Sequence, residues 1–130
     1  MGLLLLTLLA PIRASPDPQM SPEVETALAG LPDGTVVFNE YTLGGWLEWQ
    51  HRNVAPVIDG MAAPYGPTYL ARYEEAMRLG PGWQTFVRGT GARYALLYRT
   101  SPLALELQTF LRWRPLARGP STVLLVQPGA

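Results

Sequence analysis

Short apolar runs along the chain alternate with segments in which apolar residues recur every three or four positions. The short runs are typical of buried strands, and most are bounded by turn residues such as Gly, Asp or Asn. They predict strands at Thr35–Asn39, Val54–Gly60 and Arg93–Tyr98, and a closing hairpin formed by Trp113–Leu116 and Thr122–Gln127.

The segments with helical spacing predict helices between these strands. Ser21-Pro22 and Ser101-Pro102 each place a capping side chain before a proline, which is the pattern of a helix start. The apolar stripe of the second of these helices consists of Leu103, Leu107, Phe110 and Leu111. Further helices are predicted at Trp46–Arg52, from Pro67 to the glycines after residue 79, and at Trp83–Arg88.

This alternation of helices and strands predicts an α/β fold. We expect a three-layer sandwich with a small, mostly parallel sheet and a C-terminal antiparallel hairpin. The 130 residues divide into an apolar segment at 1–13, a proline-containing linker at 14–22 and a single α/β domain at 23–128. A domain of that length can bury a core of its own.

The apolar run Gly2–Ile12 has three interpretations. It is shorter than the roughly 20 residues that a membrane-spanning helix needs, so it could be the end of such a helix. It could also be the hydrophobic region of a signal peptide cleaved after Ala14, or a buried terminal helix. No basic residue precedes the run, and Ile12 is unusual three positions before a cleavage site. We therefore favour the remnant of a transmembrane helix.

The composition excludes several kinds of site. The chain has no Cys, which excludes disulfides, thiolate ligands and cysteine nucleophiles. Its one histidine, His51, cannot form a histidine cluster for zinc. Ten basic residues, all Arg, balance ten acidic residues, so the net charge gives no electrostatic footprint for nucleic acid. We expect no metal, no cofactor and no nucleic-acid partner.

The glycine pair Gly44-Gly45 joins the first predicted strand to the next helix. Many α/β domains bind ligands at such a turn, where free backbone N–H groups can hold a phosphate or carboxylate. The pair lacks the spacing of a dinucleotide fingerprint or a P-loop. Alternatively, the glycines permit a tight turn and close packing of the helix on the sheet. We favour the packing role.

Aromatic and acidic residues near this turn are further candidates. Trp46 and Trp49 are three residues apart and are predicted to share a helix face. They could stack on a sugar ring, or anchor the core or a membrane interface. Asp59 follows a strand, where it could contact a ligand or simply form an Asp-Gly turn. Nothing in the sequence places two carboxylates across a cleft, as a glycosidase requires.

Several motifs follow one another in an order that resembles a known family. They are Val37–Tyr41, Leu43–Leu47, Pro56–Gly60, Tyr65-Gly66, Gly82-Trp83, Tyr94–Leu97, Ser101–Ala104 and Trp113. Over residues 20–128 the chain resembles the soluble C-terminal domain of bacterial polytopic membrane proteins. Those proteins are similar to polyprenyl-phosphate-sugar-dependent glycosyltransferases of the GT-C type, akin to protein mannosyltransferases and oligosaccharyltransferases.

The resemblance implies a location and a role. It implies a domain on the extracytoplasmic side of the cell membrane, whose partner is the membrane-embedded part of a parent protein or the lipid surface. It also implies that this chain alone is not catalytic, because the catalytic carboxylate of such enzymes belongs to an early loop of the membrane part. The chain departs from the family pattern at Met61, where an Arg is expected after Asp-Gly. An anion site that used that Arg would be altered here.

Two functions of different class remain open. The first is a non-catalytic extracytoplasmic domain of a membrane glycosyltransferase-like protein, which supports assembly or contacts the acceptor. The second is an independent secreted or membrane-proximal module that binds a sugar or a polyprenyl phosphate. The candidate ligand-binding residues are Asn39, Tyr41, Gly44, Gly45, Trp46, Asp59 and Tyr65.

Overall fold

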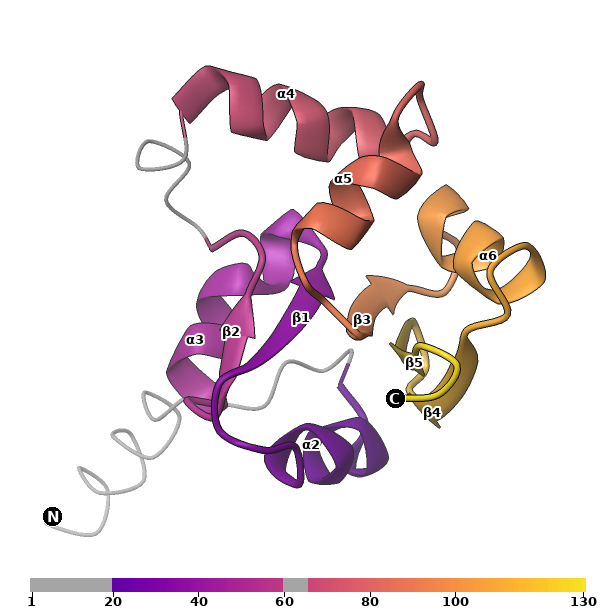
Figure 1. The fold of residues 1–130 in the computed structure, drawn as a ribbon. Coiled ribbons are helices and arrows are strands. Elements are labelled where there is room, and N and C mark those ends of the chain that lie inside the picture. The colour runs from indigo at the N-terminus through magenta and orange to yellow at the C-terminus, as the bar shows by residue number, and fades with distance from the viewer. Residues whose placement is uncertain (1–19, 60–65) are drawn as a thin grey trace, which may run out of the picture.

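Five strands of the chain form one mixed sheet in the computed structural model, which describes residues 20–59 and 66–130 (Figure 1). The strands are β1 (Thr35–Asn39), β2 (Val54–Pro56), β3 (Tyr94–Tyr98), β4 (Arg114–Arg118) and β5 (Thr122–Val126). Their order in the sheet is β2-β1-β3-β5-β4. β2, β1 and β3 run parallel, whereas β5 pairs antiparallel with both β3 and β4. The predicted α/β class with a C-terminal antiparallel hairpin is therefore confirmed.

Helices cover both faces of the sheet. α2 (Pro22–Ala29) and α3 (Gly44–Gln50) pack on one face, and the short 3-10 turn η2 (Tyr41–Leu43) leads into α3. α4 (Gly66–Met77), α5 (Trp83–Gly89) and α6 (Pro102–Thr109) pack on the other face. Figure 1 shows α4 and α5 above the sheet and α2 below it. The predicted three-layer sandwich is confirmed.

The alternation of side chains along each strand explains the two cores. Val37 and Leu96 point into the core under α2 and α3, whereas their neighbours Phe38 and Leu97 point into the core under α4, α5 and α6. Successive side chains of a strand lie on opposite faces. Because both faces are covered, each central strand is a continuous apolar run rather than an alternating one.

Both Ser-Pro helix starts are where the sequence predicts them. The Ser21 side chain accepts a hydrogen bond from the Val24 N–H at 3.2 Å, which is a helix cap. Ser101 also precedes its helix, but its side chain makes no cap hydrogen bond. Met20, within the predicted linker, is buried in the core under α2.

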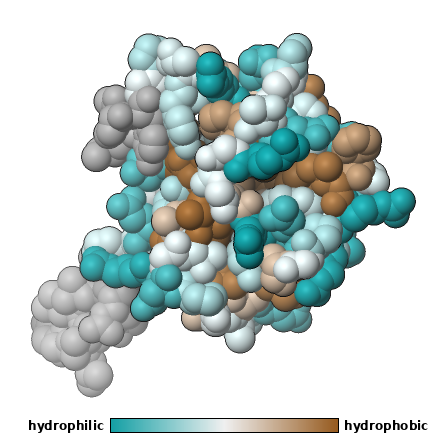
Figure 2. Space-filling model, viewed as in Figure 1, coloured by the Kyte–Doolittle hydropathy of each residue, from teal (hydrophilic) through white to brown (hydrophobic). Residues whose placement is uncertain are grey.

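Several boundaries differ from the sequence prediction, and three of these differences change the interpretation of a segment. β2 ends at Pro56, so residues 57–59 continue outside the strand. α3 begins at Gly44 and ends at Gln50, two residues earlier at each end than predicted. Phe110, assigned to the apolar stripe of α6, is 60% exposed because the helix ends just before it. Figure 2 shows hydrophobic surface over α6, consistent with exposed side chains there.

No helix in residues 20–59 or 66–130 combines the length and the apolar character needed to cross a membrane. The apolar run Gly2–Ile12 lies outside the described residues. The interpretation of that run as a transmembrane remnant therefore remains a prediction.

Candidate functional site

The carboxyl ends of β1 and β3 form a topological switch point. These neighbouring strands are parallel, yet α3, which follows β1, packs on one face and α6, which follows β3, packs on the other. Open α/β sheets commonly bind ligands in the crevice at such a point. The residues that fill this crevice therefore decide whether it can serve as a site.

Polar side chains join the ends of β1 and β3 at this crevice. Glu40, immediately after β1, is only 9% exposed, and its Oε1 accepts a hydrogen bond from the Tyr98 N–H at 3.0 Å. The hydroxyl groups of Thr42 and Tyr98 lie 2.6 Å apart and join the two strand ends nearer the surface. These contacts hold β1 and β3 together where a ligand would otherwise enter.

Burial dominates the electrostatics of Glu40. It raises the pKa of this carboxyl group, because a charged carboxylate is disfavoured away from water. The hydrogen bond from the Tyr98 N–H lowers this pKa and partly offsets the effect of burial, as does the nearby Ser101 hydroxyl group. Burial also raises the pKa of Tyr73, with the charge of Glu40 as the next cause. Tyr73 donates its hydroxyl hydrogen to the Asn39 carbonyl at 2.8 Å.

Asn39, a predicted ligand-binding residue, makes several hydrogen bonds within the protein. It is fully buried, and its side-chain Nδ2 donates to the carbonyls of Ile58 at 2.7 Å and Glu40 at 2.9 Å. Its Oδ1 accepts from the Ile58 N–H at 3.2 Å. The donor and acceptor groups of this amide are thus used within the protein.

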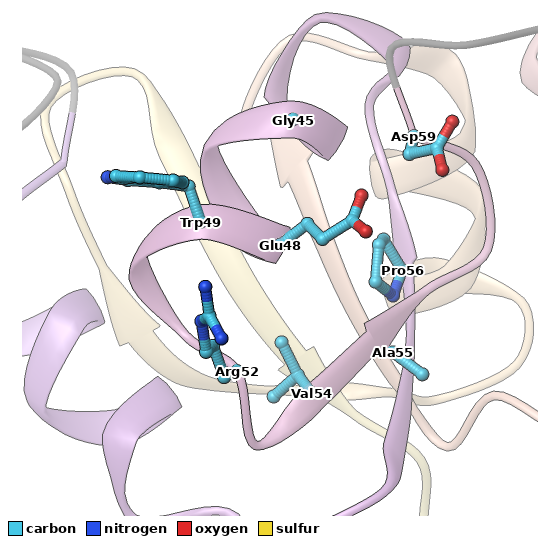
Figure 3. A pocket seen from close by; sticks show the side chains of 8 residues that line it. All are labelled: Gly45, Glu48, Trp49, Arg52, Val54, Ala55, Pro56 and Asp59. Carbon is cyan, nitrogen blue, oxygen red and sulfur yellow. The ribbon is translucent and has the colours of Figure 1, made fainter.

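An open groove lies instead beside the edge strand β2 (Figure 3). It has a volume of about 720 Å³ and runs between α3 and the segment that contains β2. Its lining residues are Gly45, Glu48, Trp49, Arg52, Val54, Ala55, Pro56 and Asp59. A volume of this size lies within the usual range of small-molecule sites.

One face of α3 and the turn after it supply the polar wall of the groove. Gly45, Glu48 and Trp49 lie along one side of α3, and Arg52 reaches the groove from the turn that follows His51. In Figure 3, Glu48 points toward Pro56 and Asp59, and Arg52 points up beside Trp49. The groove therefore combines an indole ring, two carboxylates and a guanidinium group.

The two tryptophans differ in exposure, although they lie three residues apart in α3. Trp49 is 68% exposed at the groove, whereas Trp46 is half-buried and contacts His51, with ring centroids 5.2 Å apart. Within the described chain, the indole N–H of Trp46 and Nε2 of His51 have no hydrogen-bond partner. Burial lowers the pKa of His51, and the charge of Glu25 partly offsets this effect. The aromatic side chain available to a ligand is thus Trp49 rather than Trp46.

The two glycines of the turn have different roles. Gly44 is buried, and a Cβ there would overlap the Ile58 carbonyl oxygen and lie 2.7 Å from the Asp59 Cα. Its N–H donates to the Tyr41 carbonyl, so it is not free for a ligand. Gly45 is exposed, with open space where a Cβ would lie, and it lines the groove. Close packing therefore explains Gly44 but not Gly45.

The remaining candidates fall in different places. Asp59 lines the groove, as does Gly45. Tyr41 is 40% exposed in η2, but it is not among the groove residues. Tyr65 lies outside the described residues, and so does Met61. Of the predicted set, Gly45 and Asp59 line the groove, whereas Asn39 and Gly44 are buried beside the backbone of residues 58 and 59.

Sequence reasoning missed Glu48, Trp49 and Arg52 as members of one site. Their spacing of one and three residues, together with Gly45, was a usable signal for a shared face. The position of Asp59 opposite Glu48 had no such signal, since it depends on tertiary contacts. In the part of the chain that is described, His, Asp and Glu side chains form no group of three or more able to hold a metal ion.

Comparison with known proteins yields no relative. No protein-family model, no curated protein and no solved structure matches the chain.

Proposed function

We propose that the groove beside β2 binds a neutral sugar. In this proposal the chain is the non-catalytic extracytoplasmic C-terminal domain of a membrane glycosyltransferase-like protein, where it contacts the glycan acceptor or supports assembly. The order of sequence motifs supports the choice of parent protein. The geometry of the groove supports the choice of ligand.

The exposure of Trp49 is the observation that carries the ligand class. A large aromatic ring that stays 68% exposed forgoes most of the stabilisation that burial would give it. A pyranose ring can cover such an indole with its apolar C–H face. Hydroxyl groups of that sugar can meanwhile accept from Arg52, which points toward Trp49, and those of a neighbouring sugar unit can donate to Glu48 and Asp59 farther along the groove.

The charge of the groove favours a neutral sugar over a polyprenyl phosphate. Among the described residues that line the groove, two carboxylates, Glu48 and Asp59, accompany one guanidinium group, that of Arg52. A phosphate in this groove would therefore meet more like charge than opposite charge. Sugar hydroxyls carry no such penalty.

Addition of a peptide strand along the free edge of β2 fits this surface less well than sugar binding does. In the register of β1 with β2, Val54 and Pro56 turn their backbone groups away from β1. Pro56 has no N–H, and the Val54 N–H already donates to the His51 carbonyl at 3.1 Å. An added peptide strand would find carbonyl groups there without matching donors.

Calorimetric titration of the full chain with glucan, mannan and N-acetylglucosamine tetrasaccharides tests the proposal. We expect saturable binding of at least one of them, lost in Trp49→Ala. Phe110→Ala removes another exposed aromatic side chain, on the opposite face of the sheet, and should leave binding unchanged. Equal loss in both variants, or no binding of any tetrasaccharide, would contradict it.

The alternative is an independent secreted or membrane-proximal binding module. It would use the same groove, so sugar binding does not separate the two functions. Sequencing the genomic DNA upstream of Met1 separates these two functions. A continuous frame that encodes hydrophobic spans supports the domain of a larger membrane protein, whereas a promoter and ribosome-binding site directly upstream support the independent module.

A further inference from the structure

The charges of the chain are unevenly distributed despite a net charge of zero. Residues 76–130 carry seven Arg and one Glu, a formal net charge of +6, and residues 1–75 carry the opposite excess. The sugar groove belongs to the acidic half. The basic half therefore offers a separate electrostatic environment, in which an anion is favoured.

A small cavity lies within the basic half, between α5, the amino end of β3 and the carboxyl end of β5. Its volume is about 200 Å³. Arg88 and Gln84 reach it from α5, Arg93 from the residue before β3, and Gln127 from the residue after β5. Part of its lining is apolar and includes Trp113, which is buried.

Backbone contacts fix the positions from which these side chains reach the cavity. The Gln127 N–H donates to the Arg93 carbonyl at 2.8 Å, which extends the β3–β5 pairing by one step beyond both strands. Gly91 has φ of +77°, a left-handed conformation that suits glycine, and it turns the chain from α5 into β3. Arg88 and Arg93 thus reach the cavity from either side of a short turn.

We propose that this cavity binds a phosphate group. Two guanidinium groups and two side-chain amides supply N–H donors, and Arg suits the geometry of phosphate oxygens. Among the described residues that line the cavity, none is acidic. Arg112 and Arg114 flank Trp113 in the sequence and add to the positive field.

The size of the cavity limits what can enter. A volume of about 200 Å³ is below the roughly 300–1,000 Å³ of typical small-molecule sites, so the phosphate group enters and the rest of its carrier stays outside. Free phosphate and a phosphomonoester lipid headgroup share this chemistry. The site does not depend on sugar binding at β2, because the two share no residue.

The test uses the full chain at low ionic strength with two probes. Inorganic phosphate represents the free anion, and phosphatidylcholine vesicles with or without phosphatidic acid represent the headgroup. The variant is Arg88→Gln with Arg93→Gln. Its matched control, Arg99→Gln with Arg118→Gln, removes the same charge at the opposite end of the β3–β5 pairing. Thermal unfolding of both unliganded variants checks that they remain folded.

We expect saturable phosphate binding that weakens at least about tenfold in the Arg88/Arg93 variant and stays unchanged in the control. Binding only to vesicles with phosphatidic acid, with the same dependence on variant, supports the site and identifies a lipid headgroup as the source. Absence of saturable binding to both probes would overturn the proposal. Equal weakening in both variants would also overturn it, because that result indicates diffuse attraction by the basic half.

Discussion

The side chain of Asn39 pairs with the backbone of Ile58 as another strand would. It donates to the Ile58 carbonyl at 2.7 Å and accepts from the Ile58 N–H at 3.2 Å. The last backbone contact before it is the Val57 N–H with the Val37 carbonyl at 3.0 Å. Asn39 therefore keeps residues 57–59 attached to the end of β1 after β2 has ended. This attachment places Asp59 at the groove.

Replacement of Asn39 should destabilise the fold. Asn39→Ala leaves the backbone groups of Ile58 buried without these partners, and we expect the free energy of unfolding to fall by about 3 kcal/mol. Asn39→Asp should cost more, because a carboxylate would face the carbonyl oxygens of Ile58 and Glu40. Urea denaturation measures both. Thr42→Val, at an exposed hydrogen bond, is the control and should change stability little; an Asn39→Ala variant as stable as this control would contradict the assignment.

The neighbouring glycines Gly44 and Gly45 should respond oppositely to alanine. Gly44→Ala would force a methyl group against the backbone of Ile58 and Asp59, and we expect a loss of about 1–3 kcal/mol. Gly45→Ala points into open space within α3, so it should raise stability by about 0.5–1 kcal/mol. Thermal denaturation of the two variants tests this. A tolerated Gly44→Ala would show that α3 does not need its close approach to residue 58.

Glu40 should make stability depend on pH. Because burial raises its pKa from 4.5, the folded state binds its proton more tightly than the unfolded state does. Its contribution to stability is therefore fully present below pH 4.5 and is lost as the pH rises through the folded-state pKa. Glu40→Gln keeps an acceptor for the Tyr98 N–H but has no carboxyl group to titrate, so it removes this loss of stability with rising pH.

Comparison of urea unfolding for wild type and Glu40→Gln between pH 4 and pH 8 isolates this effect. His51 acts in the opposite direction, since its lowered pKa removes stability as the pH falls below 6.5, but it is present in both proteins. The stability of the variant relative to wild type should rise with pH. A difference that stays constant across this range would contradict the role assigned to Glu40.

The elements of this fold could be predicted from the sequence because local signals agree with the tertiary structure. The continuous apolar run of β1 marks a strand covered on both faces, and Ser21-Pro22 marks the start of α2. The groove could be predicted only in part. The spacing of Glu48 and Arg52 indicates a shared helix face, but the place of Asp59 follows from the contact between Asn39 and Ile58, which no local pattern encodes.

The tryptophans illustrate the same limit. Three-residue spacing alone places Trp46 and Trp49 on similar sides of α3. The contact of Trp46 with His51, which follows the helix, turns that ring inward, and Trp49 remains at the groove. Similarly, no local pattern predicts the burial of Glu40, which depends on the meeting of β1 and β3.

The most direct test of sugar binding follows the indole N–H signals of the tryptophans by two-dimensional NMR during titration with the tetrasaccharides. We predict that the Trp49 signal shifts saturably with at least one of them, while the signal of buried Trp113, outside the groove, stays in place. A Trp49 signal that does not move with any tetrasaccharide, or that moves no more than that of Trp113, would contradict sugar binding at this groove.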